Sequence, residues 1–504
     1  MQSPNTPSLV DLPDELLENI VDRLDDESLI QLSMTCKRLH FFVLPIVFAR
    51  ANILEGNIDD ATCFYLHDPP AHILRALQLA LFIQNVDSLG IDFGYPASTI
   101  LPYARELNKL VSRLPSVKRF YLNLSHSLSP SAPNPGWQKE VLLLLDLVVN
   151  RSCVLLSVDG GDGITGDYTP ATGSQSSRHV NPIDRQIRCI LRRLDGAVRS
   201  MASLGRRNHH RGLREFRALS VVLLHPPFLD WTISTLQSNS QTLTAVSFEI
   251  DRTPADTWHY ILSSITLPFL SRFKLSPDGV VVEQRTVKFG DVLGFLTRHP
   301  SIVDLDLYGI TLPGGPQPQT LLPALQILRA DPWLISWFLA CEQPFRYLTS
   351  LEMVSEYSQD LNFPFGSNTN TFDNALGLLP HSAPQVNTLH ITLYPEAGIA
   401  EWLEKQISQP EETSPLAALE RVTTLNLFQS RNMWQSDVVA LMPHFLARFS
   451  GLQHLIYAPP PPGVERAIRT SFIREIKLAC PGMKIVTVET GSPVDIDTLS
   501  LDPD

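Results

Sequence analysis

The sequence is poor in cysteine and in charged residues. Its six cysteines are scattered over 504 residues and form no C-x-x-C pair. This spacing favours reduced thiols over a disulfide or zinc framework, so we expect no metal site. Charged residues make up 18% of the chain, below the usual share of about 25%. The chain is therefore expected to depend on apolar packing, for which its 44% of hydrophobic residues provide ample material.

Long apolar runs and an excess of basic residues are also absent. The most apolar stretch, Val141 to Val149, contains Asp146 and is too short to cross a bilayer core about 30 Å thick. The first residues contain no secretory signal pattern. The net charge of −12 provides no positive footprint for phosphate groups. We expect a cytoplasmic or nuclear protein that binds neither membrane nor nucleic acid.

Signatures of catalysis are missing as well. A G-x-G-x-x-G run at residues 161–166 is followed by Pro170, which prevents the helix that a dinucleotide site needs. His209 and His210 have no further metal ligand at a suitable spacing, and no serine occupies a nucleophile elbow. The arginine-rich stretch 184–217 is typical of a solvated helix face, or of a patch for an acidic partner. We predict a protein without catalytic residues or cofactors, although an enzyme with an unrecognised site remains an alternative.

The first fifty residues do contain a pattern typical of three short helices. Between residues 14 and 24, five apolar residues share one broad helical stripe. Asp25 and Asp26 can cap a second helix, and a third apolar segment, from Leu39, is expected to end at Pro45. The stripe is wide enough to serve both the core and a partner. A helical hairpin packed on the rest of the chain is the alternative.

The same residues resemble the F-box family, including its fungal members. The likeness covers about 40 residues and rests on the following positions: Leu12, Pro13, Asp14, Glu15, Leu16, Leu17, Ile20, Leu24, Leu29, Leu32, Cys36, Lys37, Arg38 and Phe42. Met34 and Thr35 depart from the usual small-plus-valine pair. The resemblance implies binding to a Skp-type adaptor and, through it, to a cullin ubiquitin ligase. The residues implied to supply the adaptor contact are Leu12, Pro13, Leu16, Ile20, Leu24, Leu29 and Leu32.

A second pattern recurs along the remaining chain: apolar, two residues, apolar, one residue, apolar. Chance alone would produce about forty such matches at this composition, so spacing and proline must select the relevant copies. Thirteen copies follow one another at spacings of about 23 to 38 residues, with one gap of 60, starting at Val86, Val117, Cys153, Leu213, Leu243, Leu270, Ile302, Leu325, Leu348, Val386, Val422, Leu452 and Met483. Six of them have a proline two residues before the start: Pro115, Pro268, Pro300, Pro323, Pro384 and Pro481. Such a proline ends a helix and favours an extended residue before a strand.

Helical stretches separate the predicted strands, which gives units of roughly thirty residues. This arrangement is the leucine-rich repeat plan, with parallel strands on the concave side and helices on the convex side. The usual consensus asparagine is mostly missing, so the array is irregular. We predict an α/β protein made of a small helical F-box module and a solenoid. A pair of doubly wound α/β domains is the alternative.

The predicted organisation follows from these patterns. Residues 1–8 are expected to be a disordered N-terminus, 9–50 the F-box, 51–85 a connecting helical segment, 86–490 the repeat array and 491–504 a disordered acidic tail. Within the array, residues 159–182 are rich in glycine, serine and threonine, which is typical of a mobile insertion.

Target binding is expected at strand positions between the core residues, whose side chains point to the concave face. The candidate residues are Asp304, Asp306, Tyr308, Glu352, His390, Tyr394 and Phe428. The aromatic residues would anchor a partner, and the acids would favour a basic target. Scattered surface residues without a role are the alternative.

The combined interpretation is a substrate receptor of an SCF-type ubiquitin ligase, acting in ubiquitin-dependent protein degradation. The F-box would bind the Skp-type adaptor, and the repeats would bind a target protein that the sequence does not identify. A scaffold that uses the same two surfaces without directing ubiquitination is the alternative.

Overall fold

The structure is a computed structural model, and it describes fifteen stretches of the chain. These are residues 12–51, 53, 63–83, 85–93, 100–124, 136–161, 212–250, 253–277, 286–311, 321–354, 369–393, 398–429, 436–457 and 466–488, together with 494–495. The chain divides into two compact units, Met1–Glu215 with Pro226–Trp231, and Phe216–His225 with Thr232–Asp504. The predicted disordered N-terminus and nearly all of the predicted insertion lie outside the described residues, as does most of the arginine-rich stretch.

Three helices form the N-terminal module. They are α1 (Asp14–Val21), α2 (Asp26–Ser33) and α3 (Lys37–Arg50). The predicted cap of the second helix is confirmed, because the Asp25 carboxylate accepts a hydrogen bond from the Ser28 amide at 2.8 Å. The predicted end of the third helix at Pro45 is wrong, since α3 continues to Arg50. Buried Val47 and Phe48 lie beyond the proline, and their packing offsets the lost backbone hydrogen bond.

The first unit continues with four parallel strands and the helices between them. In chain order these are β1 (Cys63–His67), α4 (Ala71–Leu79), β2 (Asn85–Asp92), α5 (Ile100–Arg113), β3 (Ser116–Asn123), α6 (Trp137–Asn150) and β4 (Leu155–Asp159). Each strand pairs in parallel with the next. The segment 51–85 was expected to be helical, and β1 corrects that expectation. The repeat pattern is present there in a weak form, Ala61, Phe64 and Leu66, which starts with alanine and lacks the proline.

The second unit repeats the same plan. Its elements are β5 (Glu215–Leu219), η5 (Val221–Leu224), α8 (Phe228–Ser238), β6 (Ala245–Glu249), α9 (Ala255–Ser264), β7 (Arg272–Ser276), α10 (Phe289–Arg298), β8 (Asp304–Leu307), β9 (Ile327–Ala330), α11 (Pro332–Leu339), β10 (Ser350–Val354), α12 (Thr369–Ser382), β11 (Thr388–Leu393), α13 (Ile399–Ser408), η7 (Glu411–Thr413), β12 (Thr424–Gln429), α14 (Ser436–Leu446), β13 (His454–Tyr457), α15 (Arg466–Ala479), β14 (Ile485–Val488) and β15 (Val494–Asp495). From β6 to β14 neighbouring strands pair in parallel. β15 pairs antiparallel with β14, so part of the predicted disordered tail is ordered.

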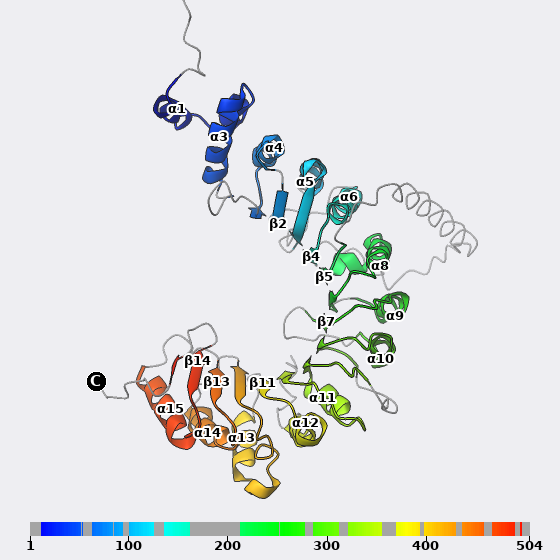
Figure 1. The fold of residues 1–504 in the computed structure, drawn as a ribbon, viewed down its shortest axis with the longest axis vertical. Coiled ribbons are helices and arrows are strands. Elements are labelled where there is room, and N and C mark those ends of the chain that lie inside the picture. The colour runs from blue at the N-terminus through cyan, green and yellow to red at the C-terminus, as the bar shows by residue number, and fades with distance from the viewer. Residues whose placement is uncertain are drawn as a thin grey trace, which may run out of the picture. The chain divides into compact units, whose positions relative to one another are not determined.

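Each of the thirteen predicted pattern copies leads into one of the strands β2 to β14. The second apolar residue of each copy is fully or almost fully buried, as Leu89, Phe273 and Leu455 illustrate. Helices α4 to α6 lie along one face of the first unit's strands, and α9 to α15 along one face of the second unit's strands (Figure 1). The other sheet face carries no helix in the described part of either unit, and we call it the open face. The predicted α/β solenoid is thereby confirmed.

The selected prolines occupy one position in a tight turn. The amide of Leu270 donates to the carbonyl of Leu267, which places Pro268 at the second position of a four-residue turn. The same bond closes the turns around Pro300, Pro323 and Pro384. Proline suits this position because its fixed φ matches the turn. Its role is therefore to join each helix to the following strand.

Side chains near the helix ends also join successive repeats. Arg113, at the end of α5, donates to the carbonyl oxygens of Gln78, Ala80 and Ile83 at the end of the previous repeat's helix. Arg298, at the end of α10, donates in the same way to the Leu262 carbonyl. These bonds satisfy carbonyl groups that a helix end leaves without partners. They link the repeat of α4 to that of α5, and the repeat of α9 to that of α10.

Candidate functional site

Helix α1 has two different apolar sides. Leu17 and Val21 are fully buried in the module, whereas Leu16, one residue away, is 51% exposed. Ile20 lies one turn after Leu16 and is half-buried. Because residues four apart share a helix face, Leu16 and Ile20 form a short apolar row directed away from the core. The broad stripe seen in the sequence therefore serves two surfaces.

Two arginines on α3 hold the other two helices in place. Arg38 pairs with Asp14 at 2.6 Å and donates to the carbonyl oxygen of Leu12 at 2.8 Å. Arg50 donates to the carbonyl oxygens of Leu24 and Val21 at 2.9 and 3.0 Å, at the end of α1. The bonds of Arg38 fix the start of α1 and those of Arg50 fix its end, so the apolar row has a defined position relative to α3.

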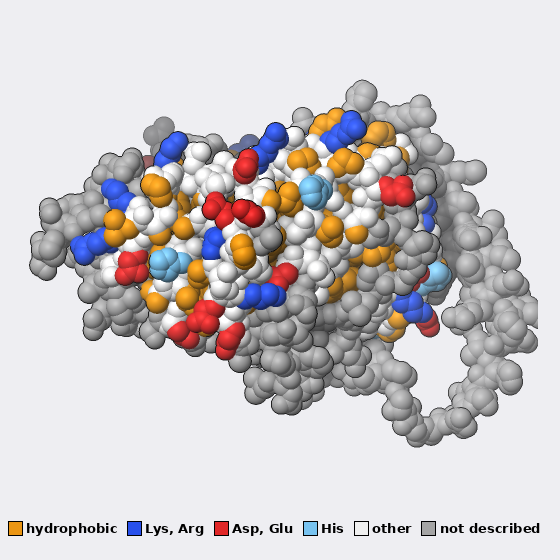
Figure 2. Space-filling view, turned by 90° about the horizontal axis from the view of Figure 1, so that it is seen from below, with side chains coloured by type: hydrophobic (Ala, Val, Ile, Leu, Met, Phe, Trp, Pro, Cys, Tyr) orange, Lys and Arg blue, Asp and Glu red, His pale blue; other side chains and the backbone are white. Residues whose placement is uncertain are grey.

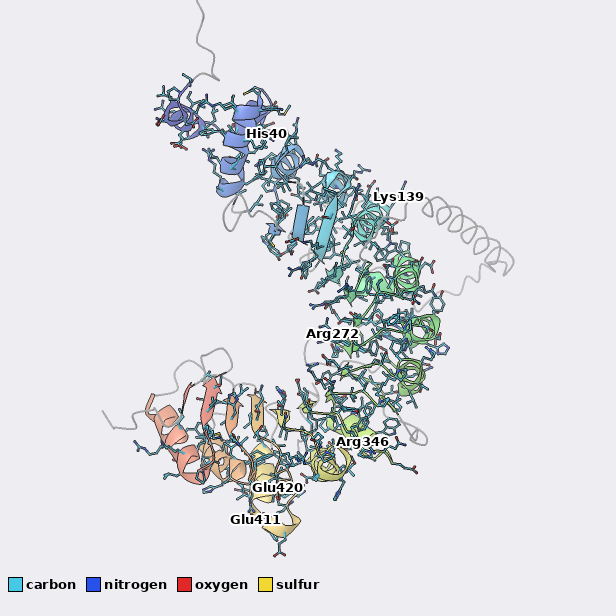
Figure 3. All side chains as sticks on the ribbon, in the orientation of Figure 1. His40, Lys139, Arg272, Arg346, Glu411 and Glu420 are labelled. Atoms are coloured by element: carbon cyan, nitrogen blue, oxygen red, sulfur yellow. The ribbon has the colours of Figure 1, made fainter. Side chains whose placement is uncertain are left out.

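The module is also seated on the first repeat. His40 is buried at the junction between α3 and α4 (Figure 3). Its Nε2 accepts a hydrogen bond from the amide of Leu81 at 3.1 Å. His72 on α4 lies 3.7 Å from the Asp26 carboxylate on α2. The three helices are thus continuous with the repeats of the first unit, and the outward row of α1 belongs to a supported module.

The seven residues implied to contact an adaptor do not share one environment. Pro13 and Leu16 are exposed, while Leu12, Ile20, Leu24 and Leu32 are half-buried. Leu29 has no exposed surface, because it points into the core between α2 and α3. We therefore remove Leu29 from the candidate surface. The sequence did not single out Met34 and Phe41, which are apolar and each 51% exposed. In the sequence, the feature that could have indicated Met34 and Phe41 is that each is an apolar residue outside the main helical stripe.

On the open face of the second unit, charged side chains of alternating sign form one row. The strand register aligns Lys274, Asp306, Arg329 and Glu352 on β7 to β10, followed by His390 on β11. Lys274 Nζ lies 3.4 Å from Asp306 Oδ2. Arg329 Nε lies 3.3 Å from Glu352 Oε2. We call these five residues the charged row.

Asp304 and Tyr308 flank the charged row. Arg329 Nη1 bonds Asp304 Oδ1 at 2.7 Å, so one guanidinium serves two carboxylates. Tyr308 is half-buried, and its hydroxyl is enclosed without a hydrogen-bond partner among the described residues. Burial, reinforced by Glu352 and Asp306, raises the pKa of Tyr308 well above its ordinary value. The structure therefore brings Asp304, Asp306, Tyr308 and Glu352 together on the open face, and their role in target binding stays a prediction.

Burial is the main cause of the pKa shifts of Asp306, Glu352 and His390. It raises the pKa of the Asp306 carboxyl, although Lys274 and Arg329 oppose that shift. It likewise raises the pKa of Glu352 against the effect of Arg329. Burial and the nearby Arg329 lower the pKa of His390, which favours the neutral imidazole. These carboxylates are tied to partners of their own chain.

The expectation that the acids favour a basic target stays a prediction, and the structure adds cations to the same face. Arg272 lies opposite Asp304 in the register, on the sheet side away from the helices (Figure 3). Together with Lys274 and Arg329 it balances the three carboxylates. The sequence of a single strand does not show that Arg272, Lys274 and Arg329 lie opposite acids on the neighbouring strand. They occupy the same place in the repeat pattern as the acids, and aligning the copies would have revealed them.

The two remaining candidates fall partly outside the described residues. Tyr394 is not described. For Phe428 the structure describes the backbone, which pairs with Thr392 on the neighbouring strand. The predicted role of Tyr394 and Phe428 in target binding therefore stays a prediction.

The described residues also bear on metal binding and on membrane insertion. Within the described ranges, no three His, Cys, Asp or Glu side chains are grouped so as to hold a metal ion. No helix there has the length and apolar character needed to cross a membrane. On the face seen in Figure 2, acidic, basic and apolar side chains are interspersed.

Comparison with known proteins matches one part of the chain to a family. The family model for the F-box domain matches residues 9–45. No curated protein matches the chain. Among solved structures, the chain is similar to the Rad7 and Elc1 complex of yeast, with 12% identity, a TM-score of 0.36, and coverage of 92% of this chain and 96% of that one. It is also similar to the leucine-rich repeat protein LegL7 of Legionella pneumophila, with 13% identity, a TM-score of 0.32, and coverage of 75% and 85%. At these scores the likenesses carry no argument about function.

Proposed function

Because residues 9–45 are an F-box domain, we propose that this chain is an adaptor subunit of an SCF-type cullin ubiquitin ligase. In this role the F-box binds a Skp-type adaptor and the repeats bind a target protein. The chain performs no chemistry itself. It raises the concentration of the target near the catalytic partners of the ligase.

The observation that carries this proposal is the division of α1 into two apolar rows. Leu17 and Val21 complete the core, so Leu16 and Ile20 are not needed for it. An exposed leucine beside a half-buried isoleucine on a short, well-fixed helix offers a partner an apolar surface. Burial of each such side chain contributes roughly 1.5–3 kcal/mol relative to full exposure.

The cysteine chemistry is compatible with the compartment in which such a ligase works. The five cysteines in the described part of the chain are free thiols. Burial raises the pKa of Cys153 to about 12 and that of Cys480 to about 11, which keeps both in the unreactive thiol form. These features fit a reducing environment such as the cytosol or nucleus.

The test is co-purification of the chain with a Skp-type adaptor. The double variant Leu16→Asp with Ile20→Asp places charge on the outward row and is expected to lose the adaptor while remaining folded. Leu143→Asp is the matched control, because Leu143 is an apolar residue on α6 that is 46% exposed. Undiminished adaptor binding by the double variant would overturn the proposal. An assembly that contains the adaptor but no cullin would support a scaffold without ligase activity.

A further inference from the structure

The open face of the first unit contains a cavity of about 630 Å³. The strand register places four residues across its floor: Tyr65, Gly90, Tyr121 and Ser157, on β1 to β4 in that order. A glycine at the second position leaves room above β2. The ring of Tyr65 occupies part of that room, since a Cβ at Gly90 would meet its Cδ2 atom at 2.5 Å. The absence of a side chain on β2 therefore lets an aromatic ring lie over the strand.

Tyr65 is unusual for an aromatic residue on this face. It is 60% exposed, whereas Tyr121, two strands away, is half-buried. Large aromatic side chains with exposed rings are common anchors for protein partners. The enclosed hydroxyl of Tyr308 in the second unit offers less to a partner than these two rings do. The aromatic anchor expected on the repeats thus has its best candidate in Tyr65.

The charge of the cavity defines the kind of partner. Asp159, on β4, is the one charged side chain among the described residues that line it, and it is exposed. The other polar lining residues, Ser88, Asn123 and Ser157, are uncharged. Asp92, two residues after Gly90 on β2, does not line the cavity and bonds His67 at 2.8 Å. Burial raises the pKa of the Tyr65 hydroxyl, and the charge of Asp92 adds to that shift. Arg119 is on the same face of β3 but does not line the cavity.

We propose that this cavity binds a short segment of a target protein through an arginine or lysine side chain. The cation lies against the rings of Tyr65 and Tyr121, which attract positive charge through their faces, and Asp159 provides the complementary carboxylate. The cavity is larger than one side chain, so neighbouring residues of the segment contact Ser88, Asn123 and Ser157. This inference deepens the proposed function, on which it rests, by stating what the repeats recognise.

The experiment uses the purified full chain and a bead-bound library of random hexapeptides. Beads that retain the protein are sequenced, and one selected peptide is measured by fluorescence anisotropy. We expect enrichment of arginine or lysine, and at least tenfold weaker binding when that arginine is replaced by citrulline or that lysine by its acetylated form. Tyr65→Ala is expected to weaken binding at least tenfold. Asp159→Asn is expected to weaken it and to reduce its dependence on salt.

Tyr260→Ala is the matched control, since Tyr260 lies on α9 and is 48% exposed. It should leave peptide binding unchanged. The inference is overturned if no peptide is selected, if the selected peptides lack a basic residue, or if Tyr65→Ala binds as well as the parent while remaining folded. The adaptor variant with Leu16→Asp and Ile20→Asp separates the two hypotheses. If it loses the adaptor and keeps the peptide, both hypotheses hold. If the parent binds the peptide but no adaptor, the proposed function alone is wrong.

Discussion

The buried imidazole of His299 links two consecutive repeats through the amide of Leu267. Its Nε2 accepts a hydrogen bond from that amide at 2.8 Å, and its Nδ1 lies 2.7 Å from the carbonyl oxygen of Phe295. The ring must therefore carry its proton on Nδ1 and be neutral. Protonation of Nε2 would set two N–H groups against each other, so the neutral ring is the form that links the two repeats.

We predict that His299 makes the stability of the second unit depend on pH. Burial lowers the pKa of His299 from its ordinary value of 6.5, so the unfolded chain binds more protons below that pH. The stabilisation is present above about pH 6.5 and is lost as the pH falls toward the lower folded pKa. Calorimetry at pH 7.5 and pH 5 measures the difference in melting temperature between the two pH values. This difference should be smaller for His299→Gln than for the parent, because glutamine keeps a hydrogen-bond acceptor and does not titrate. The exposed His444→Gln should behave like the parent, and an unchanged pH dependence in His299→Gln would contradict the prediction.

Leu16 and Leu29 are predicted to have opposite roles despite belonging to the same motif. Leu29→Ala should destabilise the first unit by about 2–5 kcal/mol, because it leaves a cavity in a closed core. Leu16→Ala should change stability by less than about 0.5 kcal/mol. Leu16 is 51% exposed, and a bound adaptor would bury that exposed half of the side chain. Loss of this burial should weaken adaptor binding roughly tenfold. Denaturant unfolding and a binding titration on both variants check this separation. Equal effects on stability would show that the exposed row is part of the core.

The fold was predictable because its core positions follow a short period. Each strand needs two inward apolar residues, and the turn before it often needs a proline, so thirteen strands could be located from the sequence. The strand at Cys63–His67 was not located, because its first pattern residue is Ala61 and no proline precedes it. This strand, β1, is recognised by its parallel pairing with β2 rather than by its local sequence pattern.

The candidate sites were less predictable, for a physical reason. A helical stripe shows that α1 is amphipathic, but only packing decides that Leu17 faces the core and Leu16 does not. The charged row depends on pairs such as Asp304 with Arg329, whose strands are neighbours only after two repeats have been aligned. The cavity at Tyr65 depends on the missing side chain of Gly90 on the next strand. Such relationships lie between repeats, where a single repeat pattern carries no information.

Arg329 is predicted to stabilise the second unit more at neutral than at acidic pH. Its guanidinium bonds Asp304 and lies beside Glu352. Arg329→Ala therefore leaves these two carboxylates without the cation that they share. Because the Arg329 side chain is 32% exposed, the loss at pH 7 should be about 1–2 kcal/mol. Burial already raises the pKa of Glu352, and removal of the cation raises it further. Lowering the pH protonates Glu352 and reduces the difference in stability between variant and parent. Urea unfolding at pH 7 and pH 4 measures this, with the exposed Arg346→Ala as control. A difference that grows at pH 4 would be inconsistent with this role.

The last prediction concerns Asp373, on which three side chains of α13 converge. Its Oδ1 accepts hydrogen bonds from the indole N–H of Trp402 at 3.0 Å and from the amide group of Gln406 at 2.7 Å, while Oδ2 pairs with Lys405 at 2.6 Å. Trp402 and Gln406 are almost completely buried, so no solvent replaces a lost acceptor.

Asp373→Ala should therefore destabilise the second unit by about 2–5 kcal/mol, since each buried donor left without a partner costs about 1–3 kcal/mol. Asp373→Asn keeps a carbonyl oxygen for the two buried donors and loses the charge opposite Lys405, a group that is 48% exposed. It should cost less than about 1.5 kcal/mol, close to the effect of Lys405→Ala. Chemical unfolding of the three variants checks this order. Similar losses for the alanine and asparagine variants would mean that the charge of Asp373, rather than its hydrogen bonds to α13, holds the two helices together.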